Sequence, residues 1–151
     1  MNCEIKSISK LLSMNDSGET GGHQAGMLIP KREEILSFFP RLDNSQKNPR
    51  VAMYFTDNSG KTWKMNFIYY NNRFFGGTRN EYRLTGMTAY FRKSNLKSGD
   101  EVILTRENNQ LSIDYKRGNV PVTQEVMADA QKKTILVLGD GWKVIDYHKE
   151  R

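Results

Sequence analysis

The stretch from Ser17 to Pro30, SGETGGHQAGMLIP, places one of the chain's two histidines, His23, among four glycines. Glycine loses more conformational freedom on folding than any other residue, so a glycine-rich loop is costly to order unless its backbone must approach something closely. The apolar run that follows the loop is typical of a strand anchored in a core. Two interpretations remain open: an ordinary surface loop, or a recognition loop that becomes ordered on a ligand.

Positive charge is concentrated in a second stretch. The chain has a formal net charge of +6 and an isoelectric point near 9.4. Between positions 73 and 97 six cations stand against one anion, Glu81, for a local balance of +5; the cations are Arg73, Arg79, Arg83, Arg92, Lys93 and Lys97. Such an excess is typical of a surface that binds a polyanion such as nucleic acid, although a solvated basic face is a common alternative.

Catalytic and metal-binding patterns are weak. Asp114 and Lys116 in SIDYK, with Asp100 upstream, match the acid and D-x-K pattern of magnesium-dependent nucleases, but alternating acid and lysine is ordinary on an exposed strand. Cys3 is alone and the two histidines lie far apart, so no zinc-binding spacing exists. We therefore expect no catalytic residue, no metal site and no cofactor, and we keep a compact nuclease as an alternative.

Composition indicates one soluble globular domain. A chain of 151 residues can bury a core without disulfides, and a lone cysteine without a secretory signal favours a reducing cytoplasm. No apolar run approaches the roughly 20 residues that span a bilayer, so we expect no membrane partner.

The elements that must position these stretches are mostly strands. Alternating and β-branched runs predict seven of them, at 3–9, 51–56, 61–70, 101–106, 111–116, 134–139 and 142–147. Turn residues in DNSGK (57–61) and ENNQ (107–110) predict two antiparallel hairpins. Short helices are expected at 30–39 and 88–96, and a third is plausible at 123–133. A mainly β fold of this kind favours a closed or nearly closed barrel.

Two motifs resemble the N-terminal effector domain of EcoRII-type restriction endonucleases. The family pairs a TGGHQ-G--IP loop with a YYN-R-FG-TRNE-R loop, and the matching residues here lie between Thr20 and Pro30 and between Tyr69 and Arg83. The recognisable resemblance covers roughly residues 12–86. It implies a seven-stranded DNA-binding pseudobarrel (B-three-like), in which an N-arm (17–31) and a C-arm (73–83) grip the major groove.

The resemblance also implies roles for individual residues. Base reading is assigned to His23, Arg79, Asn80, Glu81, Tyr82 and Arg83. Backbone contact or arm formation is assigned to Ser17, Thr20, Gly22, Gln24, Gly77 and Thr78. Apart from the resemblance, basic character assigns phosphate contact, or no particular role, to Lys31, Arg73, Arg92, Lys93 and Lys97. In an extended arm Arg79 and Glu81 point to the same side, where arginine can bond guanine O6 and N7 and a carboxylate can accept from cytosine N4. A G·C-containing site follows, in agreement with the 5'-CC(A/T)GG sites that the family reads.

Three positions depart from the family pattern. Gly77 stands where the family tends to carry lysine, Leu28 where it has tyrosine, and Tyr82 where a cation is expected. These changes bear on the site preference and the affinity rather than on the mode of binding.

The sequence therefore predicts a single domain (1–151) that reads double-stranded DNA without cutting it. We expect it to be the target-reading module of a longer bacterial or archaeal restriction endonuclease, whose catalytic nuclease domain is its partner in the same full-length chain. A standalone DNA-binding regulator of the same fold is the second hypothesis, and the compact nuclease of Asp100, Asp114 and Lys116 is the third.

Overall fold

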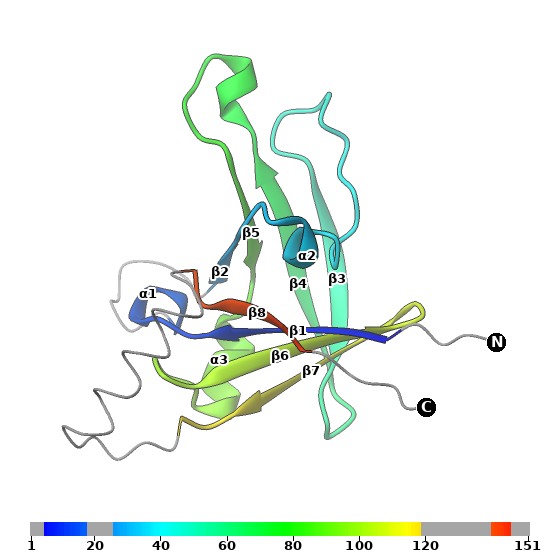
Figure 1. Cartoon of the computed structure of the whole chain (residues 1–151), viewed down its shortest axis with the longest axis vertical. Coiled ribbons are helices and arrows are strands. Elements are labelled where there is room, and N and C mark those ends of the chain that lie inside the picture. The colour runs from blue at the N-terminus through cyan, green and yellow to red at the C-terminus, as the bar shows by residue number, and fades with distance from the viewer. Residues whose placement is uncertain (1–4, 18–25, 119–139, 146–151) are drawn as a thin grey trace.

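The computed structural model describes residues 5–17, 26–118 and 140–145 (Figure 1). Within them the elements follow in the order β1 (Ile5–Leu11), α1 (Met14–Ser17), β2 (Gly26–Ile29), α2 (Glu33–Leu36), β3 (Arg50–Thr56), β4 (Thr62–Tyr70), η1 (Asn72–Phe75), β5 (Glu81–Thr85), α3 (Thr88–Ser94), β6 (Glu101–Glu107), β7 (Gln110–Lys116) and β8 (Trp142–Ile145). No helix among these residues is long and apolar enough to cross a membrane.

The strands form one curled sheet. Its order is β2-β5-β4-β3-β7-β6-β1-β8, and neighbouring strands run antiparallel except β3 and β7, which pair in parallel through Thr56 and Ser112. Side chains link the two ends of this sheet. The Trp142 indole N–H donates to the Leu28 carbonyl at 2.9 Å, and the Arg32 guanidinium bonds both the Asp140 carboxylate and the Trp142 carbonyl. The sheet is therefore a half-barrel whose ends are joined by this seam.

Alternation along the strands explains which face is buried. In β4, Trp63, Met65 and Phe67 point into the core while Lys64 lies exposed between them. Such a period of two is what a strand covered on one face requires. Every longer strand contributes buried side chains to one hydrophobic cluster, which α2 and α3 extend through Ile35 and through aromatic side chains. The fold thus places the arms on a single continuous core.

The prediction of a mainly β pseudobarrel with short helices is confirmed, with a different strand count. The hairpins across 57–61 and 107–110 join antiparallel pairs, as predicted. The first strand is described from Ile5 and ends at Leu11, two residues later than predicted, and the described residues contain eight strands rather than seven. Two strands lie outside the seven. β2 has 4 residues and occupies the apolar run after the glycine-rich loop, which is typical of an anchored strand, whereas β5 begins in the predicted C-arm and its 5 residues are too few for alternation to reveal. The predicted strand at 134–139 and helix at 123–133 lie outside the described residues.

The predicted helix at 30–39 is shorter than expected. Only Glu33–Leu36 is helical, because Arg32 is still extended and the chain after Leu36 tightens into turns, in which Phe38 and Phe39 N–H donate three residues back, just before Pro40. The helix at 88–96 is confirmed as α3, and Asn95 ends it in the left-handed conformation with φ of 54°. The short elements α1 and η1 were not predicted.

Candidate nucleic-acid interface

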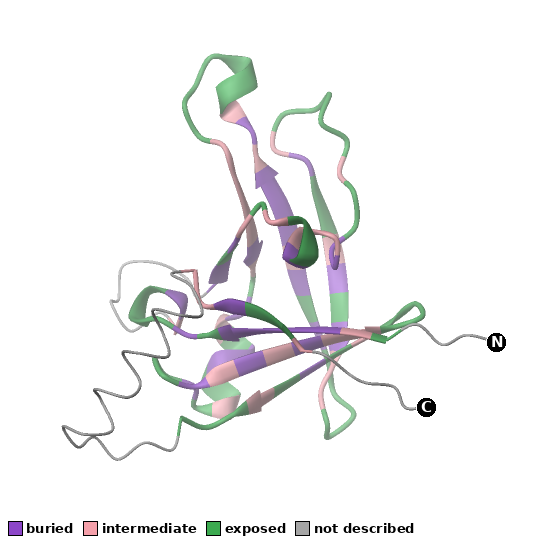
Figure 2. Cartoon of the chain, in the orientation of Figure 1, coloured by how far each residue is buried: buried purple, intermediate pink, exposed green. Residues whose placement is uncertain are grey.

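The loop between β4 and β5 carries most of the predicted C-arm and projects from the sheet as its most distant exposed segment (Figures 1 and 2). Two backbone bonds fix its shape. Arg73 N–H donates to the Arg79 carbonyl at 2.9 Å, and Gly77 N–H donates to the Asn72 carbonyl at 2.8 Å. Gly76 adopts a φ of 93°, which L side chains rarely accept. The arm is therefore an ordered turn on two strands.

Gly77 has a steric reason for its departure from the family pattern. A Cβ at this position would lie 2.8 Å from the Cβ of Asn72, closer than real contacts allow. A lysine here would force the tip of the loop to move. The neighbouring Thr78 is exposed on the same turn.

Arg79, Glu81 and Arg83 form a row at the base of the arm, and we call them the arginine row. Arg79 donates to Glu81 Oε2 through Nε at 3.1 Å and Nη2 at 2.9 Å, and Arg83 Nε donates to the same oxygen at 2.9 Å. The Arg79 guanidinium also lies over the Tyr70 ring, 3.8 Å from its centroid. These contacts orient both arginines before any ligand arrives, which lowers the cost of binding.

The row leaves recognition groups available. Among the described residues, the three bonds that Glu81 accepts all go to Oε2, so Oε1 can accept from a ligand. The side chains of Arg79 and Arg83 remain 46% and 36% exposed. Burial by itself raises the pKa of Glu81, but the hydrogen bonds and charges of Arg83 and Arg79 outweigh it and hold that pKa below its ordinary value. The carboxylate is thus an ionised acceptor beside two cationic donors. These groups complement the major-groove edge of a G·C pair, where guanine O6 and N7 accept hydrogen bonds and cytosine N4 donates one.

Asn80 and Tyr82 are placed differently from the arginine row. The Tyr69 hydroxyl donates to Asn80 Oδ1 at 2.6 Å, which fixes the amide at the base of the arm. The Tyr82 ring stacks on Tyr69, with centroids 4.1 Å apart and planes at 7°, and on Phe67 at 5.6 Å. Burial raises the pKa of the Tyr82 hydroxyl. Tyr82 therefore packs on the inner face of β5, and a base contact by this residue stays a prediction.

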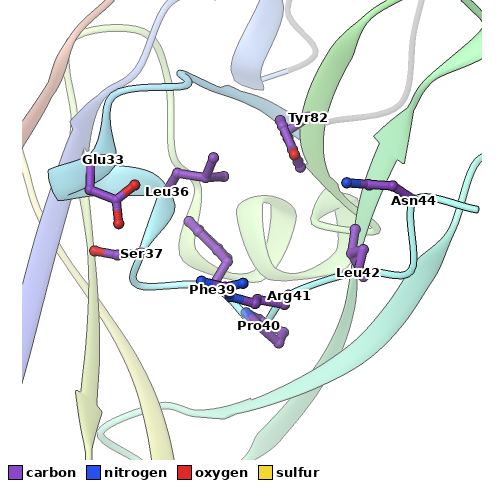
Figure 3. Close-up of a pocket in the computed structure, with 9 residues that line it drawn as sticks. All are labelled: Glu33, Leu36, Ser37, Phe39, Pro40, Arg41, Leu42, Asn44 and Tyr82. Atoms are coloured by element: carbon purple, nitrogen blue, oxygen red, sulfur yellow. The ribbon is translucent and has the colours of Figure 1, made fainter. Parts of the chain in front are cut away.

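A pocket of about 520 Å³ opens beside Tyr82, between β5 and the segment that leads from α2 toward β3 (Figure 3). Tyr82 forms one wall, and Leu36, Phe39 and Leu42 supply apolar surface beside the polar Glu33 and Asn44. The inner face of β5 thus borders a cavity, whereas its outer face carries the arginine row.

Asn71 is a structural residue of the arm that the sequence did not single out. Its side chain is fully buried; its amide N–H donates to the Gln46 carbonyl at 2.9 Å, and its Oδ1 accepts from the Asn48 backbone N–H at 2.7 Å. The Tyr69 N–H adds a bond to the Pro49 carbonyl. The segment before β3 is therefore clamped to the base of the C-arm. The sequence signal for Asn71 was its place in the Tyr-Tyr-Asn part of the family motif, which gave it no role.

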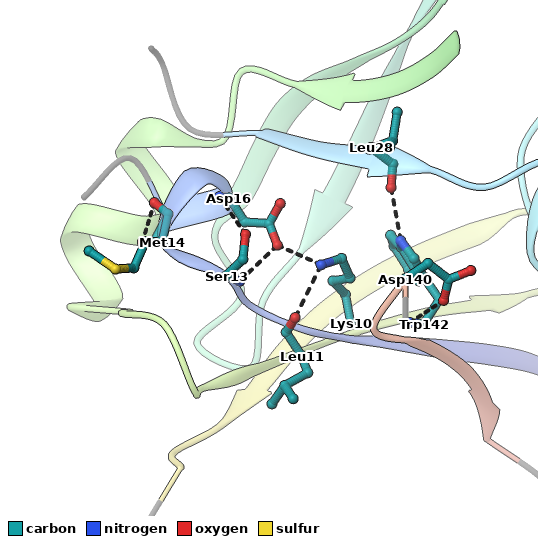
Figure 4. Close-up of polar contacts among 9 residues, drawn as sticks. Lys10, Leu11, Ser13, Met14, Asp16, Leu28, Asp140 and Trp142 are labelled. Carbon is teal, nitrogen blue, oxygen red and sulfur yellow. Dashed lines mark hydrogen bonds and ion pairs between the residues drawn. The ribbon is translucent and has the colours of Figure 1, made fainter. Parts of the chain in front are cut away.

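The predicted N-arm is anchored at both of its ends. On the amino-terminal side, Lys10 Nζ donates to Asp16 Oδ2 at 2.6 Å and to the Leu11 carbonyl at 3.1 Å, and both ionic side chains are about nine-tenths buried (Figure 4). Asp16 also accepts from the Ser13 backbone N–H at 2.9 Å, which holds α1 in place. On the carboxyl-terminal side, β2 is held by the Trp142 bond to Leu28.

Residues 18–25 of the predicted N-arm lie outside the described residues, which cover only 17 and 26–31 of the stretch. Thr20, Gly22, His23 and Gln24 are among the residues not described. Ser17 ends α1 and Lys31 is exposed after β2. Leu28, at a departure from the family pattern, is 43% exposed on β2.

The remaining predicted backbone contacts are not gathered in one place. Arg73 is exposed near the tip of the C-arm, whereas Arg92 and Lys93 lie on α3 and Lys97 follows it, toward the other end of the long axis of the molecule (Figure 1). The run of charge in the sequence is therefore divided between two regions. Only its first half adjoins the arginine row.

The predicted nuclease residues do not form a metal cluster in the described structure. Asp100 is buried, and its carboxylate accepts from the Lys97 and Gly118 backbone N–H groups at 2.9 and 2.8 Å. Asp114 is exposed on β7 and accepts from the Tyr115 N–H. Within residues 5–17, 26–118 and 140–145, no group of three or more potential ligands could hold a metal ion.

The curled sheet and its projecting arm define the class of fold as a mainly β pseudobarrel of the B-three-like kind. A family model described as "Restriction endonuclease EcoRII, N-terminal" matches residues 2–119. The chain belongs to this family of EcoRII N-terminal domains.

Individual relatives and a solved structure are consistent with this family assignment and with the fold. The type II restriction enzyme EcoRII of Escherichia coli is 40% identical over 88 residues, which cover 55% of this chain and 22% of that enzyme. Auxin response factor 22 of Arabidopsis thaliana is 27% identical over 123 residues, 78% of this chain and 19% of that protein. The chain thus spans about a fifth of these relatives. The Arabidopsis FUS3-DNA complex matches in fold, with a TM-score of 0.58, 18% identity and coverage of 74% of this chain and 96% of that one.

Proposed function

We propose that this chain is the target-reading module of a type II restriction endonuclease and binds a short double-stranded DNA site without cutting it. The observation that carries the proposal is the arginine row: two exposed arginines oriented by one carboxylate, on an ordered arm. The family and the fold supply its context, since a protein of this fold has been solved bound to DNA.

The proposed target is a 5'-CC(A/T)GG-type site read in the major groove. Arg79 bonds guanine O6 and N7 through its free guanidinium edge, and Glu81 Oε1 accepts from cytosine N4 while Oε2 keeps the arginines in place. Such a bidentate contact discriminates against the wrong base by about 1–3 kcal/mol. Arg83 bonds a base or the adjacent phosphate.

In this proposal the N-arm also contacts the DNA duplex. His23 reaches a base edge or a phosphate, and Ser17, Lys31 and Arg73 position the duplex through its backbone. Phosphate contacts orient a protein on DNA without reading its sequence, so these residues contribute affinity more than preference.

The catalytic step is assigned to a nuclease domain of the same full-length protein, because the match to the type II restriction enzyme EcoRII covers only 22% of that enzyme. In a bacterial or archaeal cell the restriction enzyme would act in the cytoplasm, where foreign DNA arrives.

The proposal is tested by substituting Arg79. We expect R79A to lose the preference for 5'-CC(A/T)GG over a random duplex of equal length while retaining weak, salt-sensitive binding to both, because phosphate contacts remain. Arg92, exposed on α3, gives the matched control, and R92A should keep the preference. Equal losses on the two duplexes for R79A would contradict base reading by that residue. Dissociation constants from fluorescence anisotropy provide the measurement.

A further inference from the structure

Two phenylalanines are exposed side by side at the tip of the C-arm. Phe74 is 64% and Phe75 44% exposed, and both lie on the short helix η1 (Figure 2). Two neighbouring aromatic rings expose a large apolar area to water, and burying that area against a partner is favourable. A pair at a loop tip therefore indicates a contact surface, in contrast to isolated apolar side chains.

The backbone that carries the two rings is fixed by the structure of the turn. Phe74 N–H donates to the Asn71 carbonyl at 2.9 Å, and Asn71 is itself clamped in the fold. Gly76 in the left-handed region closes the turn after Phe75. The pair is thus a fixed feature of the arm.

The charges around the pair restrict the partner. The Arg73 guanidinium lies 5.8 Å from the centre of the Phe74 ring, and Arg79 carries the arginine row on the same loop. Cations beside exposed rings fit an anionic partner that also presents small apolar groups. The major groove of DNA does so, because thymine displays its C5 methyl group there among the phosphates.

We propose that Phe74 and Phe75 contact thymine methyl groups in or next to the recognition site, adding a methyl-dependent preference to the hydrogen bonds of the arginine row. This inference rests on the proposed function, because it requires the C-arm to enter the major groove.

Replacing thymine by uracil removes the methyl group and leaves the base pair intact. Each thymine of the site and its flanks is replaced in turn, and the dissociation constant is measured for the wild type and for F74A/F75A. At one or more positions we expect uracil to weaken the wild type about fourfold, the amount expected for one buried methyl group. The same change should leave F74A/F75A unaffected. Y54A, which removes a 55% exposed aromatic ring on β3, should respond like the wild type.

A second variant guards against effects of folding. F74L/F75L keeps an apolar surface and should retain part of the uracil effect, and thermal unfolding should show all variants folded. If uracil acts equally on the wild type and on F74A/F75A, or on neither, while the wild type still prefers the site, the inference is wrong and the proposed function stands. The inference is also wrong if only the wild type self-associates, because the rings then bind a second copy. A wild type that prefers no duplex overturns both proposals.

Discussion

Glu81 is the residue on which the arginine row depends. It accepts from Arg79 and Arg83 through one oxygen and leaves the other for a ligand, so one side chain both positions its neighbours and can read a base. Its depressed pKa keeps it ionised down to pH values below the ordinary range for glutamate. A neutral amide in the same place would have a single acceptor oxygen for both tasks.

We therefore expect Glu81→Gln to reduce the preference for the proposed site about tenfold or more, in line with the roughly 1–3 kcal/mol of a specific base contact. The fold should persist, because Glu81 is only partly buried. Glu107→Gln, on the exposed β6–β7 hairpin, is the matched control and should change nothing. Competition binding between specific and random duplexes measures the effect. An unchanged preference in the Glu81 variant would show that the carboxylate does not organise recognition.

At the scale of elements, each arm is fastened to the sheet by buried polar groups. The Lys10–Asp16 pair holds α1 at the start of the N-arm, and Asn71 ties the segment before β3 to the C-arm. Buried polar side chains are retained where each of their bonds is satisfied, and removing one leaves a backbone group without its partner. Stability and arm position are thus coupled at these residues.

Asn71→Ala should lower the free energy of unfolding by about 1–3 kcal/mol, because the buried amide is lost and the Gln46 carbonyl and Asn48 N–H lose their partner at a part-buried site. Asn44→Ala in the same segment, where the side chain is exposed, should lie within about 0.5 kcal/mol of the wild type. Urea unfolding compares the two variants. Equal stabilities would mean that the clamp is not needed to hold this segment.

At the scale of the whole molecule, the environment of Asp100 separates two hypotheses for the carboxyl-terminal half: a structural role and a catalytic role. Burial raises its pKa, but bonds from Gly118, Lys97 and Arg117 outweigh burial and bring the pKa below its ordinary value. A carboxyl group with a lowered folded pKa stabilises the protein above its unfolded pKa of about 3.8, and this contribution is lost as pH falls through the folded value.

Asp100→Asn should therefore destabilise the fold by about 1–3 kcal/mol at pH 7, and its difference from the wild type should shrink as the pH is lowered below about 3.8. Asp114→Asn, on the exposed face of β7, is the control and should have little effect at either pH. Denaturant unfolding at pH 7 and pH 3 measures both. A folded, fully stable Asp100 variant would remove the structural explanation and return attention to the nuclease hypothesis.

The sequence predicted most of the sheet because its longer strands carry β-branched and aromatic residues and alternate over part of their length, as Trp63, Met65 and Phe67 show. It also placed Arg79 and Glu81 on one side of an extended arm. It did not predict that Glu81 also pairs with Arg83, that Tyr82 stacks inward on Tyr69, or that Asn71 holds the segment before β3. The Tyr82 stacking and the Asn71 bonds depend on distances between strands and on contacts between distant parts of the chain, 23 to 25 residues apart for Asn71, which no local pattern encodes. The Glu81–Arg83 pair is local, because the two residues lie two apart on β5 and share a face.

The central claim is sequence-specific DNA binding without cleavage. The most direct test is a gel-shift competition with the wild-type chain, using duplexes with and without 5'-CC(A/T)GG at physiological salt and with magnesium present. We predict selective retention of the site-containing duplex, with both DNAs recovered intact. Binding that ignores sequence would contradict base reading by the arms, and cleavage of either duplex would contradict the non-catalytic role.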